Sequence, residues 1–165
     1  MHWRRVERLR EITERGLYEV LMKTFTFTIL GRFAGNNDFI EKNRRNRYAG
    51  NNLKQGSQAI AYAEIKRQNK DKLRFDGVSR VDFTFYEKER RRDIDNIGAF
   101  AAKVVLDAMT EAGLIPDDSP KYIRAVSYTH DVDKAKPRVV VTITEIEPPK
   151  QPKRKKEPCV KRKSH

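Results

Sequence analysis

The sequence predicts a single small α+β domain in which a mixed β-sheet packs helices on one side. Three observations predict this class: short segments that alternate apolar and polar residues, longer segments with apolar residues three and four apart, and a β-α-β-α-β-β order along the chain. The 165 residues suit one domain with attachments. Hydrophobic residues make up 38% and charged residues 36%, so we expect a modest core with charged flanks.

The predicted domain runs from residue 23 to residue 147 and has an attachment at each end. Residues 1–22 form an N-terminal extension with helical apolar spacing, interrupted by Gly16, which is either an added helix or a poorly ordered leader. Residues 148–165 carry eight lysines and arginines, one acid and four prolines. Too few apolar residues remain there to offset the entropy of ordering, so we expect a disordered basic tail.

Within the domain, each expected element has its own signal. The stretch TFTFTIL and the stretch VDFTFYEK alternate apolar and polar side chains, as half-buried strands do. Two further strands near the C-terminal end enclose a turn-rich stretch that predicts a hairpin. The expected elements are strands at 24–30, 81–88, 122–130 and 138–146, a long loop at 31–52, a helix at 53–69, a helix from about 96 to Gly113, and the hairpin turn at 131–137.

The expected loop at 31–52 mixes asparagines, arginines and aromatic residues. Arg44, Arg45 and Arg47 supply forked donors that match phosphate, and aromatic rings between them can stack on bases. A solvated loop without a ligand is the alternative. We favour contact with nucleic acid, because structureless segments of this length are usually functional or disordered.

Charge and cysteine content exclude several classes of protein. The formal net charge of +13 favours a polyanion as the partner. The single cysteine, Cys159, has no second cysteine with which to form a disulfide, and it is not part of a zinc-ligand motif. No segment is apolar enough to span a membrane, and acids interrupt any signal-peptide core. We therefore expect a protein of a reducing cell interior that uses no small-molecule cofactor.

Two pairs of acids flank the central helix. Asp93 and Asp95 are two residues apart, so in an extended segment both would project from one face while Ile94 points away. Asp95 or Asn96 is a plausible helix cap, which explains only one acid. Asp117 and Asp118 follow the helix, and four converging carboxylates would suit a hard divalent cation such as Mg²⁺. Ordinary turn chemistry is the alternative for both pairs.

Three arginines, Arg90, Arg91 and Arg92, stand directly before the first acidic pair. A nuclease must hold a phosphodiester close to carboxylates that repel it. The arginines would clamp neighbouring phosphates while the metal neutralises the acids and activates water. A charged strand end with no ligand is the alternative explanation.

The stretch RRRDIDNIGAFAAKVVLDAMTEAGLIPDD resembles the signature of the RusA family of Holliday junction resolvases, which are common in phages and prophages. The matching features are the Asp-x-Asp-Asn at its start, a lysine followed four residues later by an aspartate, an Ala-Gly helix end and a closing acidic pair. These are Asp93, Asp95, Asn96, Lys103, Asp107, Ala112, Gly113, Asp117 and Asp118.

The resemblance implies a homodimeric endonuclease that cuts four-way DNA junctions with Mg²⁺ or Mn²⁺, in the cytoplasm of a bacterial host. It implies catalytic and metal-binding roles for Asp93, Asp95 and Asp118, with Asp117 as a weaker metal ligand. It also implies that Lys103 stabilises charge on the phosphate. Lys103 stands about one helical turn later than the family pattern has it, so it either keeps that role or only pairs with Asp107.

Two other functions fit the same residues. A non-catalytic DNA- or RNA-binding module would use the basic segments for binding and the acids as caps and turns. A nuclease for branched DNA in general would share every motif named above. Dependence of cutting on Mg²⁺ and on Asp118 separates the enzyme from the binding module.

Overall fold

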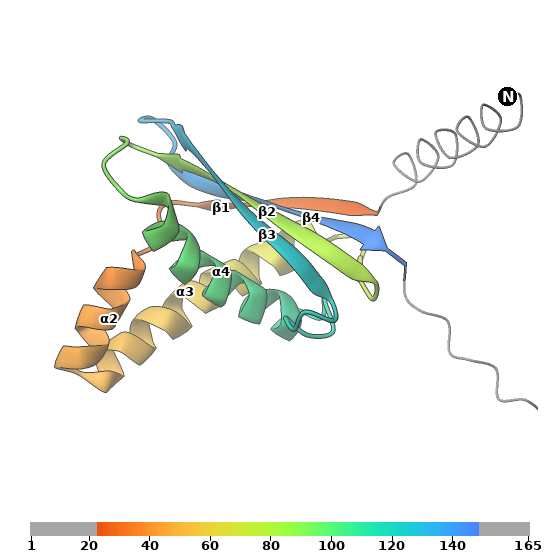
Figure 1. Cartoon of the computed structure of the whole chain (residues 1–165), viewed down its shortest axis with the longest axis horizontal. Helices are drawn as coiled ribbons and strands as arrows, with labels where there is room; N and C mark the ends of the chain where they lie inside the picture. The colour runs from red at the N-terminus through yellow and green to blue at the C-terminus, as the bar shows by residue number, and fades with distance from the viewer. Residues whose placement is uncertain (1–22, 149–165) are drawn as a thin grey trace, which may run out of the picture.

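The computed structural model describes residues 23–148 and confirms an α+β fold with a four-stranded mixed sheet. The spatial order of the strands is β1-β4-β2-β3, and only β2 and β3 run parallel. All the described helices lie on one face of the sheet (Figure 1). The elements are β1 (Thr24–Leu30), α2 (Asn36–Arg45), α3 (Arg47–Gln68), β2 (Val78–Glu87), α4 (Ile94–Glu111), β3 (Ile123–Val132) and β4 (Arg138–Glu147).

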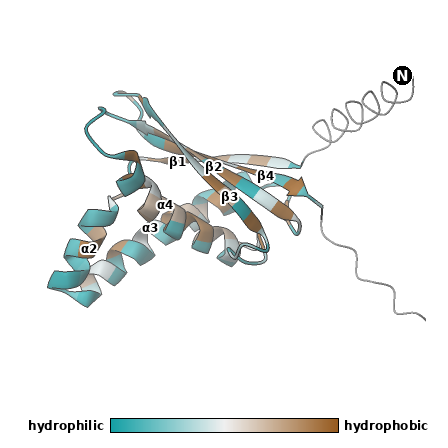
Figure 2. Ribbon diagram, in the orientation of Figure 1, coloured by the Kyte–Doolittle hydropathy of each residue, from teal (hydrophilic) through white to brown (hydrophobic). Residues whose placement is uncertain are grey.

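The sheet follows from the period-two pattern that predicted it. Every second side chain of β1, β2 and β4 is buried against the helices, and the alternate residues are often threonines on the opposite face. Thr26 and Thr142 meet there with their hydroxyl oxygens 2.9 Å apart. In Figure 2, hydrophobic segments alternate with hydrophilic ones along the strands and along helices α3 and α4. The buried hydrophobic residues of β1, β2 and β4 are Phe27, Ile29, Val81, Phe83, Phe85, Val139, Val141 and Ile143.

Helix α4 fills the centre of the core, as its apolar spacing predicted. Its buried stripe includes Ile97, Phe100 and Val104, and the helix ends as expected just before Gly113, which has a φ of 74°. Gly98 lies under the ring of Tyr128 from β3, so close that an added Cβ would stand 2.9 Å from ring carbons. The absence of a side chain at Gly98 therefore allows α4 to pack this close to the sheet.

The expected loop at 31–52 is wrong, because it contains α2 and the first part of α3. Two of its polar residues act at helix starts rather than as turn residues. The Asp38 carboxylate accepts the Gly35 N–H at 2.9 Å at the start of α2, and the Asn46 side chain accepts the Tyr48 N–H at 2.9 Å at the start of α3. Phe39 packs on Phe100 and holds α2 against the core.

Helix α3 confirms the helix expected at 53–69 but begins six residues earlier. Its last residue, Gln68, forms two hydrogen bonds with the backbone of Thr28 in β1. Because β1 is an edge strand, these bonds satisfy peptide groups that would otherwise face away from the sheet. The side chain of Gln68 thus fixes the helix to that edge.

The expected hairpin between the last two strands is also wrong. β2 lies between β3 and β4, and it pairs with both. The chain after β3 therefore passes the end of β2, where the Asp133 N–H donates to the Glu87 carbonyl at 2.8 Å. Arg138 donates to the Asp133 carboxylate, and this bond lowers the pKa of Asp133. β2, whose face is buried most regularly, lies inside the sheet between β3 and β4. Local turn signals do not reveal which strands are neighbours.

Other expectations concern the ends of the chain. The N-terminal extension at 1–22 and almost all of the basic tail at 148–165 lie outside the described residues, so these domain limits stay predictions. Within residues 23–148, no helix is long and apolar enough to cross a membrane.

Two glycines inside helices provide a matched test of the core. Gly98→Ala should lower the free energy of unfolding by about 1–2 kcal/mol, because the new methyl group overpacks the Tyr128 ring. Gly56→Ala in α3 meets open space and should raise it by about 0.5–1 kcal/mol. Urea denaturation followed by circular dichroism measures both. Equal stabilisation by the two substitutions would contradict the close approach at Gly98.

Candidate active site

The first acidic pair lies where α4 begins, just beyond the end of β2. Asp93 is the N-cap residue, with extended backbone (φ −66°, ψ 134°) and a side chain that makes no capping hydrogen bond. Asp95 is in the first turn, and its Oδ1 accepts the Asn96 N–H at 2.9 Å. Both carboxylates are exposed. The expectation of an extended Asp-Ile-Asp segment capped by Asp95 or Asn96 is wrong, since the helix already begins at Ile94.

Asn96 connects this helix start to a second one. Its Oδ1 accepts the Asn37 N–H at 2.9 Å, so α4 supplies a cap for the first turn of α2. An added Cβ on Gly35 would stand 2.6 Å from the Asn96 Nδ2, and glycine is therefore needed for this approach. The N-terminal ends of α2 and α4 lie side by side, and each contributes partial positive charge near the acids.

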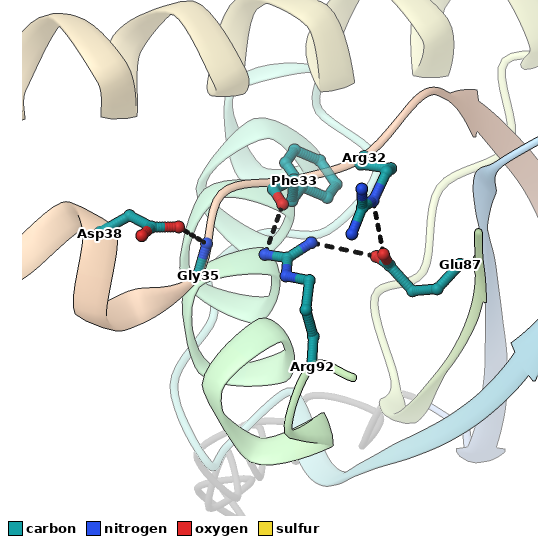
Figure 3. A network of polar contacts seen from close by, with 6 residues as sticks. All are labelled: Arg32, Phe33, Gly35, Asp38, Glu87 and Arg92. Atoms are coloured by element: carbon teal, nitrogen blue, oxygen red, sulfur yellow. Dashed lines mark hydrogen bonds and ion pairs between the residues drawn. The ribbon is translucent and has the colours of Figure 1, made fainter. Parts of the chain in front are cut away.

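A buried carboxylate supports the same region. Glu87, at the end of β2, is only 2% exposed and contacts two arginines: Arg32 Nε at 2.5 Å and Arg92 at 3.1 Å. Arg92 also donates to the Phe33 carbonyl at 2.8 Å (Figure 3). The network joins the end of β2, the connection between β1 and α2, and the segment that leads into α4. The network fixes the guanidinium of Arg92, which is the residue directly before Asp93.

The three expected phosphate-binding arginines divide into two groups. The partly buried Arg92 guanidinium is held by Glu87 and the Phe33 carbonyl, so the structure gives it a supporting position. Arg90 and Arg91 are exposed. Arg91 lies 3.3 Å from Glu89, while Arg90 has no partner among the described residues. Arg90 and Arg91 are therefore the members of this group that remain available to a ligand.

The second acidic pair lies at the other end of α4. The helix has 18 residues and spans about 27 Å, and the loop after it leads into the start of β3 (Figure 1). Asp117 and Asp118 are exposed there. A hydrogen bond with the Ser119 side chain is the main cause of a lowered pKa at Asp117, so this acid has a role in the turn.

Within residues 23–148, no three histidine, cysteine or acidic side chains are grouped closely enough to hold a metal. The expectation that all four carboxylates converge is therefore not met within one chain. Asp93 and Asp95 are brought together, and Asp117 and Asp118 are brought together, but α4 separates the two pairs.

Lys103 and Asp107 do not form the expected pair. Asp107 instead contacts Lys54 of α3, with 2.7 Å between the Lys54 Nζ and the carboxylate. Lys103 is exposed near the middle of α4, eight residues after Asp95 and thus about 12 Å further along the helix axis. Its amino group has no partner among residues 23–148.

The remaining expected DNA-binding residues lie where α2 meets α3. Arg44, Arg45 and Arg47 are all exposed. Arg45 lies 2.6 Å from Glu41 one turn earlier, an exposed pair of little energetic weight. Arg44 and Arg47 have no partner within the described part of the chain.

Sequence reasoning missed Glu87 and Arg32, although one signal was present. Val81, Phe83 and Phe85 alternate toward the core, and Glu87 is the next residue on the same face. A glutamate at an inward position requires a partner, because an unpaired buried charge is costly. That alternation would have identified Glu87, although nothing in the sequence names Arg32 as its partner.

A comparison with protein-family models decides the family. The model described as endodeoxyribonuclease RusA matches residues 36–144, from the start of α2 to near the end of β4. The chain belongs to the RusA family of endodeoxyribonucleases. A search of the curated proteins found no match. RusA enzymes act on Holliday junction DNA, so the family confirms the resemblance seen in the sequence and favours an enzyme over a non-catalytic binding module.

The buried network offers a test of what supports the site. Arg92→Met should lower the free energy of unfolding by about 3 kcal/mol, because Glu87 keeps its buried charge and loses one of its two partners. The neighbouring substitution Arg91→Met removes an exposed side chain and should cost less than about 0.5 kcal/mol. Urea denaturation compares the two variants. Similar small losses in both would show that Arg92 is not a structural partner of Glu87.

Proposed function

We propose that this RusA-family chain is a Mg²⁺- or Mn²⁺-dependent enzyme that resolves four-way DNA junctions as a homodimer. The observation that carries the proposal is the start of α4: two exposed carboxylates beside two helix N-termini, next to arginines with room for a ligand. A group of acids alone would repel phosphate, and arginines that only bind phosphate would need no acids beside them. Their combination suits a cation placed between carboxylates and a phosphodiester. Its place of action would be the cytoplasm of a bacterial or prophage-bearing cell.

The donor set fits a hard divalent cation. The Asp93 carboxylate is not used in capping, and Asp95 has only one oxygen engaged by the Asn96 N–H, so both keep oxygen donors for a ligand. When bound, Mg²⁺ or Mn²⁺ would polarise the phosphate and lower the pKa of water. Asp93 and Asp95 would hold the cation, and Asp118 is the third carboxylate we assign.

Asp118 can join that set only from a second chain. In one chain it lies beyond the far end of α4, a helix about 27 Å long that begins at the first pair. If α4 and a twofold-related copy run antiparallel, each Asp118 comes to the Asp93 and Asp95 of the other chain. Two such composite sites would match the approximate twofold symmetry of a four-way junction and permit paired cuts.

The basic residues take positions along the DNA. Arg90 and Arg91 stand directly before Asp93 and would contact phosphates next to the one that is cut. Lys103 is about 12 Å further along α4, so we assign it a phosphate away from the reacting group rather than direct charge stabilisation. Arg92 acts indirectly, by fixing Glu87 and the chain before Asp93.

Removing one carboxylate tests the catalytic assignment. Asp95→Asn should reduce cleavage of a synthetic four-way junction in Mg²⁺ to below about 1% of the parent rate, while junction binding persists. The exposed acid Glu89 is the control, since Glu89→Gln leaves the first pair intact and should cut normally. Gel analysis of labelled junctions measures both. Normal cutting by the Asp95→Asn protein would remove Asp95 from the mechanism.

Mixing two inactive variants tests the composite site. The Asp95→Asn chain and the Asp118→Asn chain should each fail to cut alone. In an equilibrated mixture about half of the dimers contain one of each, and such a dimer has one intact composite site and one doubly altered site. We expect single-strand nicks to return in the mixture. If nicking stays absent although mixed dimers are detected by native mass spectrometry, Asp118 does not act across the dimer.

A further inference from the structure

The junction of α2 and α3 is a basic projection at the end of the helical layer furthest from β1. We call residues 42–52 the helical tip; Figure 1 shows it pointing away from the sheet, and Figure 2 shows it as mostly hydrophilic. It carries Lys42, Arg44, Arg45 and Arg47. No acidic residue occurs from Lys42 to Ala63, so the tip keeps an unbalanced positive charge beyond the single contact between Arg45 and Glu41.

One aromatic ring at this tip is not explained by packing. Phe33 is buried and Phe39 packs on Phe100, so both belong to the core. Tyr48 is 81% exposed, and its side chain forms no hydrogen bond and no aromatic or cation–π contact among the described residues. Its backbone N–H is held by the Asn46 side chain, so the ring stands on a fixed helix start. A large exposed aromatic residue surrounded by arginines is typical of surfaces that bind nucleic acid.

The tip is held rigidly at both ends of α2. At the tip itself, an added Cβ on Gly50 would lie 2.8 Å from the Cβ of Asn43 and 2.9 Å from its Cα, which shows how closely the two helices cross. At the other end, Asn96 caps the first turn of α2. The position of Tyr48 relative to Asp93 and Asp95 is therefore set by one short helix.

That helix gives the reach of the tip. α2 has 10 residues and a length of about 15 Å, and it begins beside Asn96, next to the first acidic pair. Nucleotides of one strand follow each other at about 3.4 Å, so the tip would meet DNA about four or five nucleotides from a phosphate held at Asp93 and Asp95.

We propose that Tyr48 stacks on a base at the branch point of the DNA while Arg44, Arg45 and Arg47 hold the phosphates around it. The inference rests on the proposed cleavage site at the start of α4. In continuous duplex the faces of the bases are covered by their neighbours, and only where stacking is interrupted does a face become available to a ring. Tyr48 therefore contributes to recognition of branched over linear DNA, whereas the arginines bind any DNA.

A second copy of this chain is a poorer occupant for the tip. Four cations within six residues would face the same four cations if two tips met across a twofold axis. Like charges in contact oppose such an interface, while phosphates neutralise them. The charge of the tip thus selects nucleic acid as the partner of Tyr48.

The test uses full-length protein with Asp95→Asn, in a buffer with EDTA, so that binding is measured without cleavage. Tyr48→Ala is compared with Tyr48→Phe, and Ile60→Ala serves as the control because Ile60 is also exposed on α3 but lies outside the tip. The ligands are a four-way junction with 2-aminopurine beside the branch and a linear duplex with 2-aminopurine in the same sequence. Fluorescence and anisotropy report base stacking and affinity.

We expect Tyr48→Ala to weaken junction binding roughly tenfold and to lose the 2-aminopurine response, while duplex affinity changes less than about twofold. Tyr48→Phe and Ile60→Ala should behave as the parent. Unchanged junction binding by Tyr48→Ala, an equal loss on duplex, or a changed sedimentation mass would each overturn the proposal. The readout is binding, so it stays separate from the cleavage assays that test the carboxylates.

Discussion

The buried carboxylate of Glu87 is the interaction on which the rest of the candidate site depends. A charge at 2% exposure is tolerated only because Arg32 and Arg92 neutralise it and donate hydrogen bonds. The two arginines come from segments 60 residues apart in the chain, on either side of the core. One ion-pair network thereby fixes where the chain leaves β1, where it leaves β2 and where it enters α4. An isolated surface pair could not do this, because water would screen it.

From this point the functional side chains are placed in short steps. Arg92 precedes Asp93 directly, and the Phe33 carbonyl that Arg92 binds is two residues before Gly35, where α2 begins. Asn96 then joins α4 to α2. The acids, the exposed arginines before them and the basic end of α2 are consequently parts of one rigid arrangement. DNA that lies across it would meet cations at both ends of α2 and the proposed metal-binding carboxylates at one end.

Much of the fold could be predicted from the sequence, because local periodicity reports burial directly. The strands around Phe27 and Phe83 and the helix around Phe100 all stand where their patterns indicated. The helix α2 could not be read in this way, since its asparagines favour turns and none of its residues is fully buried. Its caps and the contact between Phe39 and Phe100 help to stabilise it, and sequence periodicity does not reveal them. The strand order was missed because the turn residues near Asp133 indicate a connection between two strands. They do not indicate which strands lie next to each other in the sheet.

The candidate site was predicted in part for the same reason. Asp93 and Asp95 are only two residues apart in the sequence, so their proximity needed no knowledge of the fold. The length of α4 places the two acidic pairs at opposite ends of the helix, which the expectation of convergence did not take into account. Arg92 was assigned to DNA because a sequence shows a charge but not the partner of that charge. Pairings such as that of Arg32 with Glu87, which are 55 residues apart, are decided by the tertiary structure.

The sheet order also has a consequence for the order in which the chain folds. The β2-α4-β3 unit is continuous in sequence, whereas β1 must find β4 across about 115 residues, as the pairing of Thr26 with Thr142 illustrates. Closing so long a loop is entropically costly and slow. Arg32 follows β1 directly, so Glu87 gains its second partner only when that last strand docks. Without β1 in place the buried carboxylate would keep only Arg92 as its partner, so the support of the site is complete only in the fully paired sheet.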